Sequence, residues 1–356
     1  MAGRADLISV PYWIMGFCSG IASALLFLTA ATGSVIFGLP VFIAALPVFV
    51  AGLGWGAVAA GIAALTGMIL LSFFHSSTAG LVFFVFSGAT PFWLVRQALL
   101  FRPVTPAPSR RSGRERRVLD PNMTSEPIEW YSTGALVIWC TGIAVAFFIF
   151  ATVGVSLAGY EDGLEEALRQ VLVGAVLDAG WLDQLLRIAN ARDDTIYTLL
   201  ITVLPATLPA LWIILTLGNM WAAQALLSRF QLNLRPSPRL KDMQLPLSYM
   251  GFFAGAVALS LIPGETAYFG GTVAVILATP YFLLGFGVIH AISRAWTAWN
   301  ARIVFLGLFY MLLLVEGWLI IPVWLLGLLD SGIGLRTRLS GGVIFAKRPR
   351  KSEENE

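Results

Sequence analysis

Nine long and mostly apolar runs constrain the fold of this chain more than any other feature of its sequence. A helix needs about 20 apolar residues to cross the hydrocarbon core of a bilayer, and each run is long enough for one crossing. Charged residues make up 12% of the 356 residues and hydrophobic residues 58%, which excludes a soluble fold. The runs are 11–32, 35–52, 55–74, 79–101, 133–157, 196–228, 245–262, 268–290 and 303–329.

The length of the runs predicts helices rather than strands. Lipid offers the backbone no hydrogen bonds, so a spanning chain forms helices or a closed barrel. A barrel needs short alternating strands, which this sequence lacks. We therefore expect an all-α fold, a polytopic transmembrane helix bundle with eight or nine spans. A cytoplasmic tail would require that one of the nine runs fails to cross, or that run 303–329 forms a re-entrant pair broken near Glu316, Gly317 and Pro322.

The basic residues predict the side of the membrane on which each connection lies. Cytoplasmic loops are enriched in arginine and lysine, and both the insert 102–132 and the connector 229–244 are rich in arginine. We therefore expect a bacterial inner-membrane protein with a cytoplasmic N-terminus. Residues 1–10 carry no signal-peptide cleavage pattern, so the first span is expected to remain as an anchor. The tail 330–356 is also basic, but nine crossings would place it outside, so its side stays open.

The connections also differ in composition. The insert is rich in proline and serine, which predicts a mobile loop. Segment 158–195 is acidic with apolar residues at helical spacing, which predicts an amphipathic helix on the outer face, begun by a capping box at Asp162 and Glu165. The expected regions are a four-span bundle at 1–101, a basic cytoplasmic loop at 102–132, spans five and six with the amphipathic segment at 133–228, a basic cytoplasmic connector at 229–244, the C-terminal spans at 245–329 and a basic tail at 330–356.

Polar residues within or beside the runs are the candidates for binding a substrate, because an ionisable group in lipid is costly. Glu316 is either a proton, cation or substrate site, or a carboxyl that packs against Arg294 or Arg302. Asn219 and Gln224 either line a cavity or form hydrogen bonds across helices. The predicted substrate-binding residues are Glu316, Asn219, Tyr197, Glu265 and His75.

Small residues at every fourth position mark one face of the first run and one face of the third. Such stripes let helices approach closely in lipid, where packing drives their association. The pattern alone leaves open whether the partner helix is internal or belongs to another protein. The two stripes are Gly16, Gly20 and Ala24, and Gly56, Ala60 and Ala64.

The sequence offers little for a metal, a cofactor or covalent catalysis. Cys18 and Cys140 lie far apart within apolar runs, so we expect neither a disulfide nor a thiolate metal site. His75 and His290 have no further ligand at metal spacing and are expected to lie at the membrane interfaces. No phosphate loop, nucleophile elbow or dinucleotide fingerprint occurs. We therefore expect no enzyme, no cofactor and no nucleic-acid partner.

Three stretches resemble the YybS-like family of bacterial multi-pass membrane proteins. The first is the turn Gly52–Gly56 between the second and third runs. The second is the connector from Leu234–Pro238 through Leu245–Pro246. The third is Leu326–Asp330, followed by Gly334–Arg338.

Residues 1–230 also resemble, in the layout of their spans, the S components of energy-coupling-factor transporters. Those six-helix proteins bind a substrate and meet a coupling subunit through small residues on helix one. The resemblance implies a small-molecule ligand, with energising ATPase and coupling subunits as partners. Segment 158–195 and everything after residue 243 depart from that fold. The matching features are the turn Gly52–Gly56, the basic stretch from Arg102 and the stripe Gly16, Gly20 and Ala24.

Two functions therefore stay in view. The first is an S-component-like subunit that binds a small solute at the outer face for uptake and has no ATPase of its own. The alternative is a membrane scaffold or regulator that docks partners through its basic cytoplasmic loops.

Overall fold

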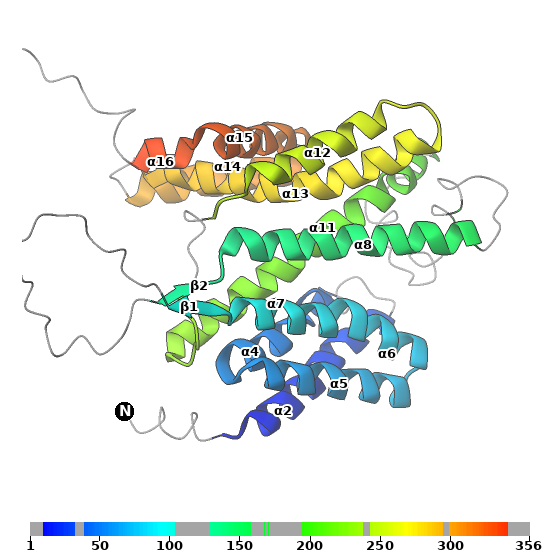
Figure 1. The fold of residues 1–356 in the computed structure, drawn as a ribbon, viewed down its shortest axis with the longest axis vertical. Coiled ribbons are helices and arrows are strands. Elements are labelled where there is room, and N and C mark those ends of the chain that lie inside the picture. Colours follow the sequence, from blue (N-terminus) through cyan, green and yellow to red (C-terminus); the bar gives the residue numbers. More distant parts are fainter. Residues whose placement is uncertain are drawn as a thin grey trace, which may run out of the picture. The chain divides into compact units, whose positions relative to one another are not determined.

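The structure, a computed structural model, describes residues 10–32, 39–103, 128–157, 194–237, 243–294 and 299–340, with two isolated positions at 167 and 170. The chain divides into two units, and the expectation of an all-α bundle is confirmed (Figure 1). Unit 1 comprises Met1–Cys140, Val173–Tyr197 and Ile214–Ser237, and unit 2 comprises Thr141–Leu172, Thr198–Ile213 and Pro238–Glu356.

The helices of unit 1 come mainly from the first third of the chain. Helices α8 (Thr133–Leu157) and α11 (Asp194–Phe230) each contribute residues to both units. The remaining elements of unit 1 are α2 (Tyr12–Leu28), η1 (Thr29–Thr32), η2 (Leu39–Ile43), α4 (Leu46–Trp55), α5 (Ala57–Phe74), α6 (Ser77–Phe83), the π-helical turn η3 (Phe84–Ala89), α7 (Thr90–Ala98), β1 (Phe101–Pro103) and β2 (Ile128–Trp130).

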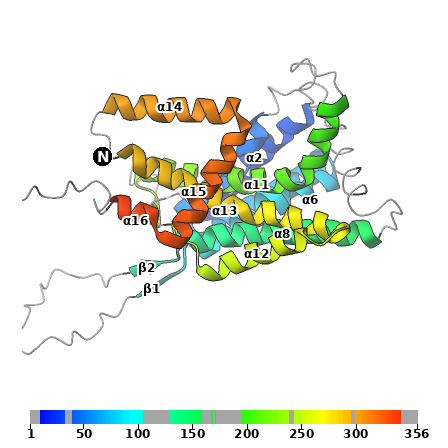
Figure 2. The same ribbon diagram turned by 90° about the horizontal axis from the view of Figure 1, so that it is seen from above.

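Unit 2 is built from the C-terminal helices. Helix α12 runs alongside α13 in both ribbon views (Figures 1 and 2). Helices α13 and α15 meet backbone to backbone, because Gly285 and Gly327 leave no room for a Cβ atom at their contact. The elements are α12 (Leu247–Ser260), α13 (Glu265–Arg294), α14 (Trp299–Val315), η5 (Gly317–Leu319), α15 (Ile320–Ile333) and α16 (Leu335–Ser340).

Each of the nine apolar runs corresponds to a helix or helix pair among the described residues. In the part of the chain that the structure describes, five helices are long and apolar enough to cross a membrane, and a bent pair in the last run can add a sixth. Three shorter apolar helices account for the remaining runs, at Tyr12–Leu28, Leu39–Trp55 and Leu247–Ser260. The five long helices are Ala57–Phe74, Ser77–Ala98, Thr133–Leu157, Val203–Phe230 and Glu265–Arg294.

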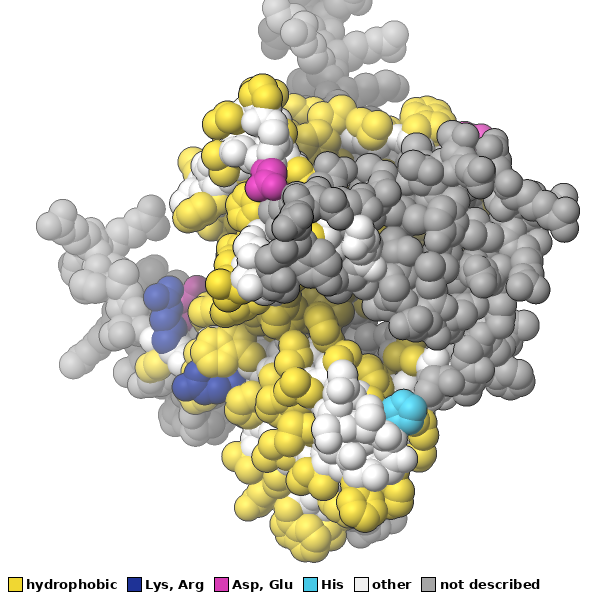
Figure 3. Space-filling model, turned by 90° about the vertical axis from the view of Figure 1, so that its right-hand side faces the viewer, with side chains coloured by type: hydrophobic (Ala, Val, Ile, Leu, Met, Phe, Trp, Pro, Cys, Tyr) yellow, Lys and Arg dark blue, Asp and Glu magenta, His cyan; other side chains and the backbone are white. Residues whose placement is uncertain are grey.

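The surface of the described helices is suited to lipid. Large apolar side chains such as Phe73, Phe74 and Leu157 are almost fully exposed. In the space-filling view, hydrophobic side chains cover most of the described surface and charged ones are few (Figure 3). Contiguous apolar surface on this scale marks a membrane-facing protein rather than a soluble one.

Helix α2 packs directly on α5 through its small residues. A Cβ atom at Gly16 would lie 2.7 Å from the carbonyl oxygen of Ala59, and one at Gly20 would lie 2.6 Å from that of Ala63. One turn further on, Ala24 belongs to a buried cluster with Leu71 and Phe83. The first stripe therefore serves an internal contact, one of the two alternatives that the sequence left open.

The second stripe is also used inside unit 1, with one correction. A Cβ atom at Gly52 of α4 would lie 2.9 Å from the Cβ of Ala60, and one at Gly88 of η3 would lie 3.1 Å from the Cβ of Ala64. Gly56 does not belong to this face, although the spacing placed it there. It forms the turn between α4 and α5 with φ of 99°, a conformation that favours glycine, and a Cβ there would meet open space.

The loop predicted at 102–132 has an ordered base that the sequence did not predict. Strands β1 and β2 pair antiparallel, with Arg102 opposite Glu129, and these two side chains form an exposed ion pair of 2.7 Å. The rings of Phe101 and Trp130 lie 5.6 Å apart. Residues 104–127 lie outside the described part of the chain, as does the predicted amphipathic helix in 158–195, apart from the isolated positions and the start of α11.

The last apolar run breaks at Glu316, as its sequence suggested. Helix α14 ends at Val315, the turn η5 follows, and α15 begins at Ile320, with a bend of 112° across the break (Figure 2). Pro322 lies in the first turn of α15, where its missing N–H needs no partner. The run is therefore either one broken span or a re-entrant pair.

The α2–α5 contact can be tested with Gly20→Ala. The added methyl would meet the backbone of Ala63, so we expect a loss of about 1–3 kcal/mol in stability. Gly142→Ala on α8 is the matched control, because a Cβ there meets open space. Thermal unfolding of the purified protein in detergent measures both, and equal midpoints for the two variants would contradict the packing described.

Candidate functional site

Glu316, the most prominent candidate from the sequence, lies exposed at the break between α14 and η5. Its carboxylate accepts a hydrogen bond of 3.1 Å from the indole Nε1 of Trp318. No described contact joins Glu316 to Arg294 or Arg302. The described contacts therefore do not support the predicted alternative, in which the Glu316 carboxyl packs against one of those arginines. The structure therefore places Glu316 at a helix break, outside any continuous helix.

The other predicted substrate-binding residues come from different elements of the fold. His75 is exposed at the end of α5, where its backbone N–H donates a hydrogen bond to the carbonyl of Leu71. Glu265 is the exposed first residue of α13. Tyr197 lies in the first turns of α11, and its side chain is outside the described part. The described side-chain contacts therefore do not gather the predicted set into one cluster.

Asn219 and Gln224, two buried amides on α11, have different surroundings. The Nδ2 of Asn219 donates 2.8 Å to the carbonyl oxygen of Phe42 in η2, so this residue forms a hydrogen bond between elements, one of the two roles expected from its sequence. Gln224 is only 2% exposed, and among the described residues neither atom of its amide has a hydrogen-bond partner. One amide thus stabilises the contact between two elements, while the other carries an uncompensated desolvation penalty.

A buried arginine organises one end of unit 1. Arg235, in the connector after α11, donates 3.1 Å to the carbonyl of Ala98 at the end of α7 and 2.7 Å to the carbonyl of Tyr131. The adjacent N–H of Leu234 donates to the carbonyl of Leu53 at 3.0 Å. Burial lowers the pKa of the Arg235 guanidinium, yet arginine keeps its charge in proteins. The connector is therefore fixed to the ends of α4 and α7.

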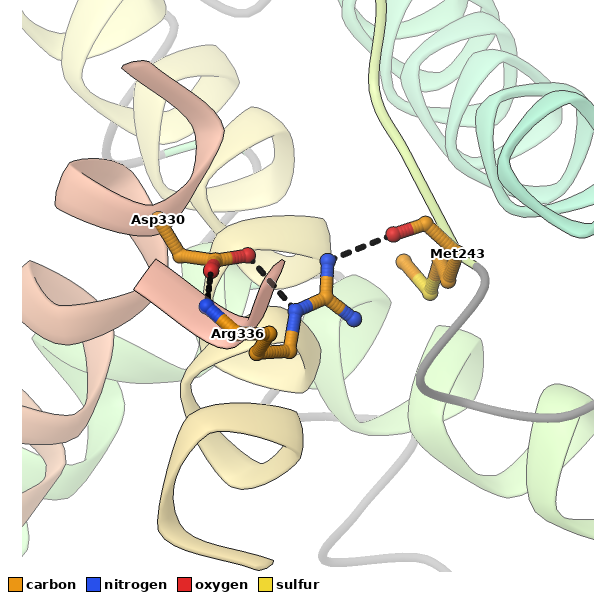
Figure 4. A network of polar contacts seen from close by, with 3 residues as sticks. All are labelled: Met243, Asp330 and Arg336. Atoms are coloured by element: carbon orange, nitrogen blue, oxygen red, sulfur yellow. Dashed lines mark hydrogen bonds and ion pairs between the residues drawn. The ribbon is translucent and has the colours of Figure 1, made fainter. Parts of the chain in front are cut away.

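Unit 2 holds a second buried arginine, which forms an ion pair (Figure 4). The Nε of Arg336 lies 2.7 Å from Oδ2 of Asp330, and its backbone N–H donates 2.8 Å to Oδ1. Its Nη2 donates to the carbonyl oxygen of Met243, which precedes α12. The pair thus joins the end of α15 and the start of α16 to the segment that leads into α12.

A cavity of about 210 Å³ lies beside this pair. One wall is polar, and the hydroxyl of Ser331 is buried there without a hydrogen-bond partner among the described residues. Such a volume holds several waters or one small organic molecule, since a water occupies roughly 10–15 Å³ on this measure. The lining residues are Gln244, Leu245, Leu284, Asp330, Ser331, Gly334 and Arg336.

Asp330, Arg336 and Arg235 were not among the site residues predicted from the sequence. The sequence places Arg336 and Arg235 in the basic tail, the basic connector and the stretches that resemble the YybS-like family, but assigns them no role in a site. The available signal was an aspartate at the end of an apolar run with an arginine six residues later. That signal does not identify the carbonyl partners of the two arginines, because Met243 lies 93 residues from Arg336 and Tyr131 lies 104 residues from Arg235.

The described residues offer no group of three or more histidine, cysteine, aspartate or glutamate side chains that could hold a metal ion. His290 instead lies 2.9 Å from the hydroxyl of Tyr310 on α14. The cavity beside Asp330 and Arg336 is the candidate site, because it brings a buried ion pair and polar side chains to one space, an arrangement that can hold a small molecule through hydrogen bonds.

The contrast between Asn219 and Gln224 gives a matched pair of variants. Asn219→Leu removes the hydrogen bond from α11 to the carbonyl of Phe42, so we expect a loss of about 1–3 kcal/mol. Gln224→Leu removes a buried amide without partners and replaces it with an apolar side chain, so we expect a gain of similar size. Thermal unfolding in detergent distinguishes them, and a destabilised Gln224→Leu variant would show that the amide has a partner.

The family described as "Predicted membrane protein (DUF2232)" matches residues 122–331, which is more than half of the chain. This segment includes most of the helices of unit 2, the connector with Arg235, and Asp330. No curated protein matches the chain, and no solved structure matches it. The description of the family agrees with the apolar helices of the fold and assigns no activity. By this match, the chain belongs to the DUF2232 family of predicted membrane proteins.

Proposed function

We propose that this protein is a subunit of the bacterial inner membrane that binds a small polar solute for uptake and works with separate energising subunits. The observation that carries the proposal is the polar cavity beside the buried pair Asp330–Arg336. Ligand sites are typically concave, with a few polar groups in fixed positions that orient the ligand. In a helical membrane protein, buried ionisable groups are expensive and mark functional sites by default.

The division of labour follows from the sequence. The chain has no phosphate-binding loop, so energy from ATP would come from a partner protein. We keep the resemblance of residues 1–230 to S components, and of the wider chain to the YybS-like family, as part of the proposal. Because Gly16 and Gly20 contact α5, a coupling subunit would dock on a different surface from the one that the resemblance implies.

The orientation is part of the same proposal. The arginine-rich insert and connector favour a cytoplasmic N-terminus, with the ends of α4 and α7 on the cytoplasmic side. The cavity adjoins the connector through Gln244 and Leu245, so it would lie near the cytoplasmic end of its helices. A solute bound in the cavity would then occupy an inward-facing site.

A thermal-shift screen of the full-length protein with small polar solutes tests this function. A solute at about 100 times its Kd stabilises a protein by about 2.7 kcal/mol, so the unfolding midpoint should rise. Ser331→Leu fills the cavity and should abolish that rise together with accumulation of the same solute by cells. Gly332→Ala is the control, because its Cβ meets open space.

The proposal would be refuted if no solute stabilised the protein and if the accumulation of solutes by cells did not depend on its gene. Binding that Ser331→Leu retains at the level of the Gly332→Ala control would place the solute elsewhere than in this cavity.

A second candidate function is a scaffold that docks partners through the basic insert. The observation that favours it is the β1–β2 ribbon, which holds the base of the insert with the pair Arg102–Glu129. Deleting residues 104–127 and joining the strands with a short glycine–serine turn should leave the ribbon intact. Loss of partner pull-down with unchanged solute accumulation would favour the scaffold, and the reverse result would favour uptake.

A further inference from the structure

We propose that the cavity beside Asp330 and Arg336 binds a small dipolar molecule of zero net charge, with a primary ammonium group at one end and an acidic oxygen at the other. This inference rests on the proposed function of solute binding and adds the chemical class of the ligand. Its evidence is the charge of the cavity wall, the hydrogen-bonding groups that remain there and the size of the space.

The charge of the wall excludes a ligand with a net charge. The side chains of Asp330 and Arg336 are 2% and 8% exposed, so they carry opposite charges in an almost water-free position. Together they sum to zero. A net anion or cation entering the cavity would lose its hydration without gaining a counter-charge. A zwitterion brings no net charge, and its dipole can lie antiparallel to that of the pair.

Asp330 retains acceptor capacity for the ammonium end. Each of its oxygens accepts one described hydrogen bond, from the backbone N–H and from the Nε of Arg336. An ionised carboxylate has about four lone-pair sites. An ammonium group can therefore donate to Asp330 without displacing Arg336.

Neutral donors are available for the acidic end. Gln244 brings an amide from the exposed side of the lining. Ser331 also lines the cavity, and its buried hydroxyl, which has no partner among the described residues, would reach a ligand by rotation about χ1. Both groups can donate to a carboxylate or phosphate oxygen. Leu245 and Leu284 supply the apolar wall against which the carbon atoms of the ligand would pack.

The size of the cavity restricts the ligand further. About 210 Å³ is below the range of roughly 300–1,000 Å³ typical of sites for drug-sized molecules. Two sources supply an ammonium and an acidic oxygen within a few atoms of each other. One is a free amino acid, and the other is the ethanolamine headgroup of a membrane lipid. The experiment must distinguish them.

Thermal unfolding of the full-length protein with three solutes of nearly equal size tests the net charge. L-Alanine is a zwitterion, L-lactate an anion and L-alaninamide a cation at neutral pH. We expect alanine to raise the unfolding midpoint at concentrations at least tenfold lower than the other two. In nanodiscs, phosphatidylethanolamine should stabilise the protein more than phosphatidylcholine, whose quaternary ammonium has no N–H to donate.

The two arms of the experiment distinguish the two sources. Stabilisation by alanine identifies a free amino acid, and stabilisation by the ethanolamine lipid without alanine identifies the headgroup; either supports the inference. Preference for lactate or alaninamide overturns it, as does no response to either zwitterion. If another solute from the broader screen still binds in that last case, the inference has failed while the proposed function stands.

Variants at the cavity connect binding to these residues. Gln244→Ala and Ser331→Ala each remove one donor, so each should weaken zwitterion binding about three- to tenfold. Gly332→Ala should bind as the unchanged protein does. Gln244 is exposed, so Gln244→Ala should fold and can be measured even if Ser331→Ala does not fold. Unchanged affinity in Gln244→Ala and in a folded Ser331→Ala protein would overturn the assignment.

Discussion

The carbonyl groups at helix ends are the constraint on which much of this structure depends. The last carbonyls of a helix have no partner within it, and near lipid they find few waters. In each unit a buried arginine supplies donors to such a carbonyl or to one in the segment next to a helix: Arg235 donates to Ala98, the last residue of α7, and to Tyr131, which precedes α8, and Arg336 donates to Met243, which precedes α12. Arginine suits this task because its planar guanidinium has several donors in a fixed geometry and keeps its charge when buried. The connector between α11 and α12 is therefore held by side-chain hydrogen bonds at both of its ends.

Between those ends, close approach of the helices replaces the hydrophobic effect as the source of stability. Lipid tails are as apolar as leucine side chains, so helices gain little from merely burying apolar surface in the membrane. They gain from dispersion contacts at short distance, which glycine and alanine permit. Gly16 and Gly20 allow α2 to touch the backbone of α5, and Gly285 and Gly327 do the same for α13 and α15. The same physical solution therefore appears in both units.

The sequence predicted the features that depend on local composition. All nine runs correspond to helices, and the break at Glu316 was expected because glycine and proline follow it. The β1–β2 ribbon was missed because three-residue strands have no measurable periodicity. Asn219 and Gln224 could not be separated because they share residue chemistry and one helix, and only the position of the Phe42 carbonyl distinguishes them. Asp330 and Arg336 were missed for a related reason: net charge by segment predicts topology, whereas an ion pair depends on the three-dimensional course of the chain.

The buried pair also bears on why a ligand would bind there at all. Removing two charges from water is expensive, and apolar residues of similar volume often give equal or greater stability. Two roles can offset that expense, namely fixing the register of the chain and forming a binding surface. Fixing the register requires only that both partners be satisfied, which Arg336 achieves with Asp330 and the Met243 carbonyl. Fixing the register does not require a cavity beside the pair. It also does not require the buried hydroxyl of Ser331, which has no partner among the described residues. Arg336 is already held in place by those contacts, so a ligand that binds at this wall would not have to order its side chain. A small molecule gains most from a few hydrogen bonds when the binding site is ordered in advance in this way.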